Sequence, residues 1–119
     1  MKVALLNGPN LNLLGMREPG IYGSETLKDV ENLLKEKISG SGMNIELVCY
    51  QSNSEGSLID FIQQSKTQGI EYIIFNPGAY THTSIALHDA ILAVGAKVIE
   101  VHISNIHKRE EYRKNSFIA

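Results

Sequence analysis

The chain has 119 residues, of which 43% are hydrophobic and 20% are charged, and its formal net charge is −2. Its length is close to the commonest domain size of about 100 to 150 residues, which predicts one domain spanning residues 1–119. The slightly acidic balance excludes a nucleic-acid surface held by bulk positive charge. No stretch approaches the roughly 18 apolar residues of a membrane span, and the first apolar run is too short for a signal peptide. We therefore expect a cytoplasmic protein that binds neither nucleic acid nor membrane.

Strand-length apolar segments recur along the chain. Four of them, rich in valine and isoleucine and bounded by Gly, Asn, Ser or Pro, are predicted as strands: residues 2–6, 45–50, 71–75 and 97–103. The single cysteine, Cys49, has apolar neighbours in the second segment. We expect it to lie in the core and not to act as a nucleophile, and a lone cysteine excludes an internal disulfide.

Each gap between these segments has the periodicity of a helix. In the first gap, apolar residues recur on one face from Leu27 to Ile38, Thr26 and Asp29 are spaced to form a capping box, and the sequence SGSG at 39–42 ends the helix. Two further helices end before glycines, and a charged stretch is a candidate for a last short helix: residues 57–68, 84–94 and 108–114.

This alternation of strands and helices predicts an α/β fold. Right-handed crossovers make successive strands parallel and place helices on both faces of the sheet. A flavodoxin-like three-layer sandwich with strand order 2-1-3-4 is the commonest arrangement at this size. Ligands of such sheets bind beyond the carboxyl ends of the strands, so the segments that follow the strands are the place to look for a site.

Unusual polar residues gather in those segments. The segments are residues 7–23, 51–54, 76–83 and 104–107, and the polar residues in or beside them are Asn10, Arg17, Tyr22, Asn76, His82 and His102. The loops at the opposite edge are short and carry few such side chains. The asymmetry predicts an active site at the carboxyl ends of the strands.

Several common site chemistries lack their sequence signature. The loop NGPNLNLLG after the first strand contains neither a P-loop ending nor G-x-G-x-x-G, which disfavours nucleotide binding. The four histidines lack the spacing of a zinc site, so we expect no metal. No G-x-S-x-G elbow occurs, and the lysines are at exposed positions, which disfavours serine and Schiff-base mechanisms. Acid–base chemistry by tyrosine, histidine and arginine around asparagines remains.

Two candidate acid–base groups follow. Glu100 and His102 are two residues apart on a predicted strand and therefore share a face, where the carboxylate can orient the imidazole. This pair predicts a general acid, but it is also typical of a half-buried histidine with a structural partner.

The second candidate is Tyr22. A tyrosine acts as a base near neutral pH only beside cations, because the pKa of free tyrosine is about 10. Arg17 on the same loop, with Arg109 or Arg113 from the last segment, supplies such cations. A loop tyrosine taken alone is also typical of a packing role.

Five motifs occur in collinear order from residue 1 to about residue 116. They are NGPNLNLLG from Asn7, REP with YG from Arg17 to Gly23, QSNSE from Gln51, NPGAYTHTS from Asn76, and EVHISN with REEYR from Glu100 to Arg113. Together they resemble the type II 3-dehydroquinate dehydratases. The resemblance implies a flavodoxin-like lyase that converts 3-dehydroquinate to 3-dehydroshikimate by anti elimination, without cofactor or metal. It also implies trimers that pack into dodecamers.

The resemblance further assigns roles to individual residues. Tyr22, deprotonated with help from Arg17 and Arg109, takes the proton beside the substrate ketone. Asn10 holds a water that stabilises the enolate, and His102, oriented by Glu100, protonates the departing hydroxyl. The implied substrate-binding residues are Asn76, His82, Asp89 from a neighbouring subunit, the backbone at Ile103, Ser104 and Arg113.

One departure from the family pattern is expected at the end of the sequence. Members of the family continue past the position of Ala119 through another strand and a C-terminal helix, so the fourth strand is expected at an exposed edge. The same elimination serves the shikimate pathway and quinate breakdown, and the sequence does not separate the two. Two other interpretations stay open: a non-catalytic binding or assembly protein on this fold, and a flavodoxin-like nucleotide module.

Overall fold

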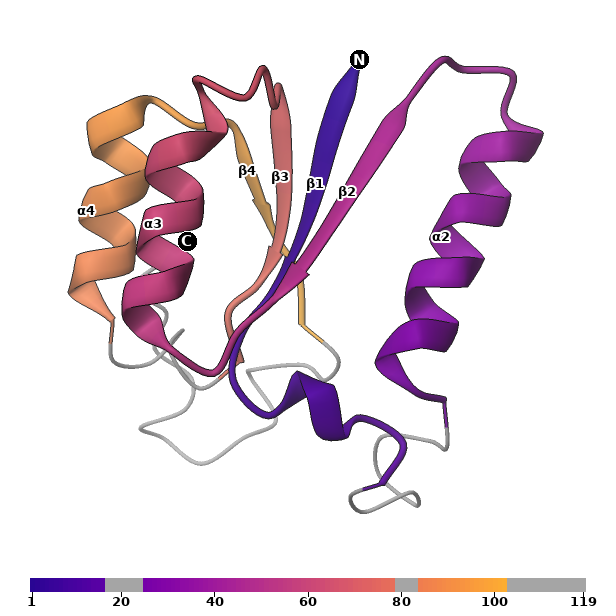
Figure 1. The fold of residues 1–119 in the computed structure, drawn as a ribbon, viewed down its shortest axis with the longest axis horizontal. Coiled ribbons are helices and arrows are strands. Elements are labelled where there is room, and N and C mark those ends of the chain that lie inside the picture. The colour runs from indigo at the N-terminus through magenta and orange to yellow at the C-terminus, as the bar shows by residue number, and fades with distance from the viewer. Residues whose placement is uncertain (17–24, 79–83, 103–119) are drawn as a thin grey trace.

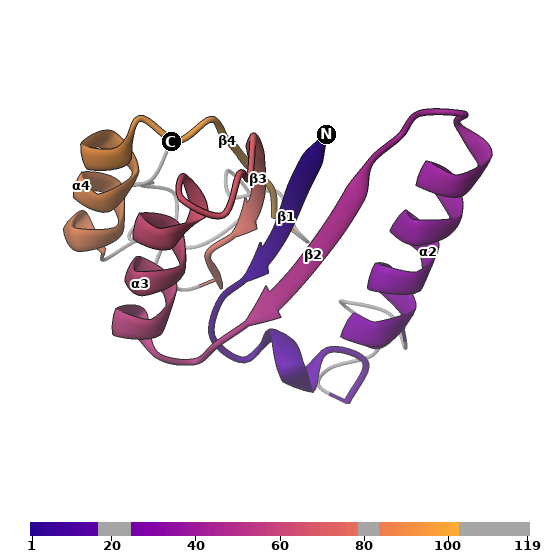
Figure 2. The ribbon, with the colours of Figure 1, turned by 45° about the horizontal axis from the view of Figure 1, so that its top comes forward.

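The computed structural model describes residues 1–16, 25–78 and 84–102. The strands form one parallel sheet of order β2-β1-β3-β4, as predicted (Figure 1). They are β1 (Lys2–Asn7), β2 (Glu46–Gln51), β3 (Tyr72–Asn76) and β4 (Val98–Glu100). The helices are η1 (Leu11–Leu13), a 3-10 helix, and the α-helices α2 (Leu27–Gly40), α3 (Glu55–Ser65) and α4 (Ile85–Val94). Helices α3 and α4 lie on one face of the sheet and α2 lies on the other (Figure 2), which confirms the α/β sandwich.

The core lies between the sheet and the pair formed by α3 and α4. Its buried members are Ala4, Leu6, Leu58, Ile62, Ile73, Phe75, Leu87 and Ala90. A fully buried side chain such as Phe75 contributes about 1.5–3 kcal/mol relative to an exposed one. β1 is central and its side chains are buried on both faces, which explains why its sequence is continuously apolar and does not alternate.

Side-chain caps determine where the helices begin. Thr26 accepts a hydrogen bond from the Asp29 backbone N–H while the Asp29 carboxylate accepts one from the Thr26 N–H, so the predicted capping box is confirmed. Ser54 caps α3 by accepting from the Ser57 N–H, and Ser84 caps α4 by accepting from the Leu87 N–H. Each cap satisfies a backbone donor that the first helical turn leaves free.

Two predicted elements differ from the structure by up to three residues at an end. The second predicted helix, 57–68, runs instead from 55 to 65, because the cap at Ser54 starts it earlier and the Ile70 N–H donates to the Ser65 carbonyl, which closes its end. The fourth predicted strand, 97–103, is assigned only from 98 to 100, although the Val101 N–H still donates to Phe75 in β3. The predicted helix over 108–114 lies outside the described residues.

The face of the sheet opposite α3 and α4 is less tightly covered. Helix α2 has no buried residue, and on β4 the side chain of Ile99 is 54% exposed. Cys49 in β2 is only half-buried, so its prediction as a core residue was wrong. The physical reason is that Cys49 lies beside Glu31 and Lys35 of α2, and α2 covers β2 only loosely. Among the described helices none is long and apolar enough to cross a membrane.

The environment of Cys49 predicts that its thiol reacts slowly. Burial raises the pKa of Cys49, and the nearby Glu31 carboxylate raises it further. Because the thiolate is the reactive form, we expect Cys49 of the folded protein to react more slowly with an aromatic disulfide reagent at pH 8 than after unfolding. The chain has one cysteine, so the absorbance of the released thiol reports this site alone. Equal rates in the folded and unfolded protein would contradict the prediction.

The same raised pKa has a consequence for stability. A thiol whose pKa is higher in the folded than in the unfolded state stabilises the fold fully below the unfolded pKa, and this contribution is lost as the pH rises through the folded pKa. The effect therefore acts only in the alkaline range and is absent from a Cys49→Ala variant.

Candidate active site

The four strands end together at one edge of the sheet. Their last residues are Asn7, Gln51, Asn76 and Glu100, and the register pairs Asn7 with both Gln51 and Asn76. The strands run downward in Figure 1, so this edge, with η1 beside it, lies at the bottom of the view. Three amides and one carboxylate thus occupy the carboxyl edge, where parallel sheets bind their ligands.

The loops that follow β1 and β3 fit closely against each other. The Gly8 N–H donates to the Asn76 carbonyl at 2.8 Å. A Cβ atom on Gly8 would lie 2.4 Å from the Pro77 carbonyl oxygen, and Gly78, at φ +61°, would carry a Cβ 3.1 Å from the Pro9 carbonyl oxygen. The two glycines in NGPN and NPG are therefore needed for close backbone approach.

Asn76 is held firmly at the end of β3. Its side chain is buried, and its Oδ1 accepts a hydrogen bond from the Gly78 N–H at 3.2 Å. Asn7, opposite it in β1, is also buried, and its Nδ2 has no hydrogen-bond partner among the described residues. The carboxyl edge thus contains a buried amide donor that no described part of the chain satisfies.

Asn10 begins η1 in an unusual backbone conformation. Its φ is 68°, in the left-handed region, and its side chain makes no capping hydrogen bond. The Asn10 backbone N–H donates instead to Asn53 Oδ1 at 2.9 Å. The carboxamide of Asn10 is consequently exposed and not used in starting the helix.

Glu100 and His102 form the predicted pair. Glu100 Oε1 lies 2.9 Å from His102 Nε2, and the two side chains are only 13% and 15% exposed. Glu100 is in register with Phe75 in β3, one residue before Asn76. The pair therefore lies beside the loop of Asn76. A hydrogen bond at Nε2 leaves Nδ1 as the ring nitrogen for proton transfer.

Among the described residues, one predicted site residue is not brought to this edge. Asp89 lies exposed on α4 and makes no hydrogen bond or ion pair to any residue that the structure describes. The remaining predicted site residues lie outside the described part of the chain: Arg17, Tyr22, His82, Ile103, Ser104, Arg109 and Arg113.

Two residues at the edge were missed as individual candidates. Gln51 and Asn53 lie in a segment that the sequence places at the carboxyl edge, but neither is an acid, a base or a cation. Their signal is positional, since an amide directly after a strand of a parallel sheet faces the ligand edge. In residues 1–16, 25–78 and 84–102, no group of three or more His, Cys, Asp and Glu side chains is arranged to hold a metal ion.

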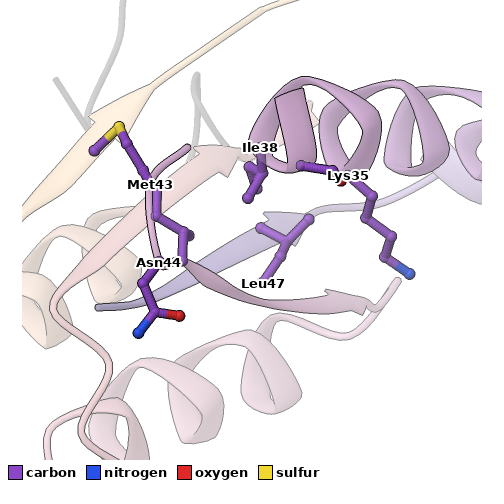
Figure 3. Close-up of a pocket in the computed structure, with 7 residues that line it drawn as sticks. Lys35, Ile38, Met43, Asn44 and Leu47 are labelled. Atoms are coloured by element: carbon purple, nitrogen blue, oxygen red, sulfur yellow. The ribbon is translucent and has the colours of Figure 1, made fainter. Parts of the chain in front are cut away.

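A pocket of about 390 Å³ lies at the other edge of the sheet (Figure 3). Its walls come from the end of α2 and the start of β2, and include Lys35, Ile38, Met43, Asn44 and Leu47. It forms where α2 leaves the sheet incompletely covered, and its lining contains no acid–base pair. We therefore place the candidate active site at the carboxyl edge and not in this pocket.

Comparison with known proteins identifies the family. The model of the family described as dehydroquinase class II matches residues 1–119. The chain belongs to this family. Similar members include a 3-dehydroquinate dehydratase of Alkalilimnicola ehrlichii, 55% identical over 118 residues, which are 99% of this chain and 76% of that protein. A protein of Sclerotinia sclerotiorum named catabolic 3-dehydroquinase is 52% identical. The match covers 99% of this chain and 77% of that protein.

Solved structures of the family have the same fold. The crystal structure of type II dehydroquinase from Butyrivibrio crossotus matches with a TM-score of 0.93 and 50% identity, over 99% of this chain and 81% of that one. The type II dehydroquinase from Propionibacterium acnes matches with a TM-score of 0.87 and 40% identity, over 98% of this chain and 79% of that one. These similarities support the flavodoxin-like arrangement.

Proposed function

We propose that the protein is a type II 3-dehydroquinate dehydratase that converts 3-dehydroquinate to 3-dehydroshikimate. The observation that carries the proposal is the partly buried Glu100–His102 pair at the carboxyl edge of a class II dehydroquinase fold. The names of the similar proteins point to the same reaction, and some of them are called catabolic. A non-catalytic role is not favoured, because the acid–base residues are retained.

The proposed reaction is an anti elimination through an enolate. Tyr22, as a phenolate beside Arg17 and Arg109, removes the proton next to the ketone, and the C–H electrons form the enolate. A water held by Asn10 stabilises the enolate oxygen. The enolate then collapses to the conjugated enone as the C–O bond breaks, and His102 donates a proton so that the hydroxyl leaves as water.

The geometry of the pair supports the role of His102. The Nε2–H of His102 donates to Glu100 Oε1, which stabilises one orientation of the ring and leaves Nδ1 to donate the proton. Partial burial of both side chains strengthens this hydrogen bond, because less water competes for the carboxylate. Asn76 lies on the adjacent strand and positions the departing hydroxyl.

Substrate recognition completes the proposal. Ser104 and the backbone of Ile103 bind the carboxylate, while the ring hydroxyls are recognised by His82, Arg113 and Asp89. Because Asp89 is exposed on α4, we assign it to the site of a neighbouring copy in a homo-oligomer of trimers packed into a dodecamer. We also propose a cytoplasmic location.

An enone assay tests the reaction. Purified protein mixed with 3-dehydroquinate in the presence of a chelator is expected to produce the ultraviolet absorbance of 3-dehydroshikimate at the same rate as without chelator. Borohydride added with substrate is expected not to inactivate the enzyme, because no lysine imine forms. A folded preparation that makes no enone would overturn the proposed function, and loss of activity with chelator would overturn the mechanism.

A further inference from the structure

A chain of side-chain hydrogen bonds joins the loops that follow β1 and β2. Gln51 Nε2 donates to the Gly8 carbonyl at 3.2 Å and to Asn53 Oδ1 at 3.1 Å. Asn53 Oδ1 also accepts the Asn10 backbone N–H at 2.9 Å. Asn53 Oδ1 thus accepts two hydrogen bonds, one from Gln51 Nε2 and one from the Asn10 backbone N–H. These two bonds use both lone pairs of the oxygen.

The backbone of Asn10 needs such a partner. In the part of the chain that the structure describes, Asn10 is the one residue other than glycine with a positive φ, at 68°. The left-handed conformation costs asparagine less than other residues with a Cβ atom, and here the hydrogen bond to Asn53 holds Asn10 in it. The backbone conformation of Asn10 determines where its carboxamide points, because that side chain is short and makes no capping bond.

Other contacts hold the two loops together without Asn53. The Ser52 N–H donates to the Asn7 carbonyl at 3.0 Å, and β1 pairs with β2 from Lys2 and Glu46 to Asn7 and Gln51. Removing the Asn53 side chain therefore leaves the strand ends in register while it removes the acceptor of the Asn10 backbone N–H. A functional effect of Asn53 is consequently separable from its effect on the fold.

We propose that Asn53, supported by Gln51, is a positioning residue for Asn10. It keeps Asn10 in the left-handed conformation that directs its carboxamide toward the enolate, and this role rests on the proposed function. The catalytic contribution of such positioning is large, since small displacements of a catalytic group slow a reaction strongly.

Kinetics of four variants test this role: Asn53→Ala, Asn53→Asp, Asn10→Ala and the double variant Asn10→Ala/Asn53→Ala. Asn53→Ala is expected to lower kcat by about 10- to 100-fold, with KM changed by no more than about twofold. Asn53→Asp retains an oxygen acceptor for both donors and is expected to restore most of kcat. In Asn10→Ala protein, adding Asn53→Ala is expected to lower kcat no further, because both substitutions disable the same group, the Asn10 carboxamide.

A matched control and three results decide the kinetic test. Asn32→Ala, on the exposed surface of α2, is expected to keep the kcat of the unchanged protein. Unchanged kcat in Asn53→Ala, a loss of equal size with and without Asn10, or an Asn53→Asp variant as slow as Asn53→Ala would each overturn the proposal. Thermal unfolding of every variant separates a loss of folded protein from a loss of rate.

A second measurement is independent of turnover. The Asn10 amide proton is expected to exchange with solvent about tenfold faster in Asn53→Ala than in the unchanged protein, and at the original rate in Asn53→Asp. Unchanged exchange would overturn the positioning role even if the enzyme is active. If instead the unchanged protein makes no enone, the proposed function fails while the exchange rates still test the contact.

Discussion

Replacing His102 with alanine is expected to lower kcat for 3-dehydroquinate by about 100- to 10,000-fold, the range that a positioned general acid contributes. The hydroxyl then has to leave without a proton donor, which raises the barrier of the second step and leaves enolate formation by Tyr22 intact. KM is expected to change little, because His102 acts on the departing group in the transition state. Initial rates of enone formation across substrate concentrations measure both constants.

Two companion variants locate the effect in the Glu100–His102 pair. His88 in α4 is the other histidine among the described residues, and His88→Ala is expected to retain the original kcat. Glu100→Gln keeps the shape of the side chain but replaces the charged acceptor that orients the His102 ring with a neutral amide oxygen, so a smaller loss is expected than for His102→Ala. If His102→Ala retains the kcat of the His88→Ala control, the proposed general acid is wrong.

Local sequence rules predict most of the fold. The capping box at Thr26 and Asp29 involves residues three apart, so it can be recognised without any tertiary information. The parallel sheet follows from the alternation of strands and helices together with the handedness of crossovers, whereas its order 2-1-3-4 is predicted only as the commonest arrangement at this size. The contact of Glu100 with His102 is equally local, because two residues on one strand face the same way.

Contacts that depend on register cannot be predicted in this way. Asn53 reaches Asn10 across 43 residues of sequence, and it does so because Asn7 and Gln51 are paired at the ends of adjacent strands. A shift of one residue between β1 and β2 would turn the amides of β2 to the other face. The half-buried state of Cys49 likewise depends on how closely α2 covers β2, which the apolar run around Cys49 does not encode.

Adding a methyl group at Gly8 is expected to destabilise the fold and to disturb the candidate active site. In Gly8→Ala, the new Cβ would lie 2.4 Å from the Pro77 carbonyl oxygen and 2.7 Å from the Pro77 carbonyl carbon, both backbone atoms that no side-chain rotation can move. The loops have to separate, which weakens the hydrogen bond from the Gly8 N–H to Asn76. We expect the free energy of unfolding to fall by about 2–4 kcal/mol, from overpacking and the lost hydrogen bond.

The control for Gly8→Ala is a substitution that is expected to raise the free energy of unfolding. Gly56 is the second residue of α3, and among the described residues a Cβ there meets only Ser54 Oγ at 3.7 Å, so Gly56→Ala is expected to stabilise the protein by about 0.5–1 kcal/mol. Urea unfolding followed by circular dichroism measures both changes. Separation of the loops also displaces Asn10 and Asn76, which lie close to Gly8 and Pro77. The Gly8→Ala protein that still folds is therefore expected to have a lower kcat as well. Equal stability of the two variants would show that the 7–10 and 76–78 loops are not in close backbone contact, and would remove the reason for glycine in NGPN.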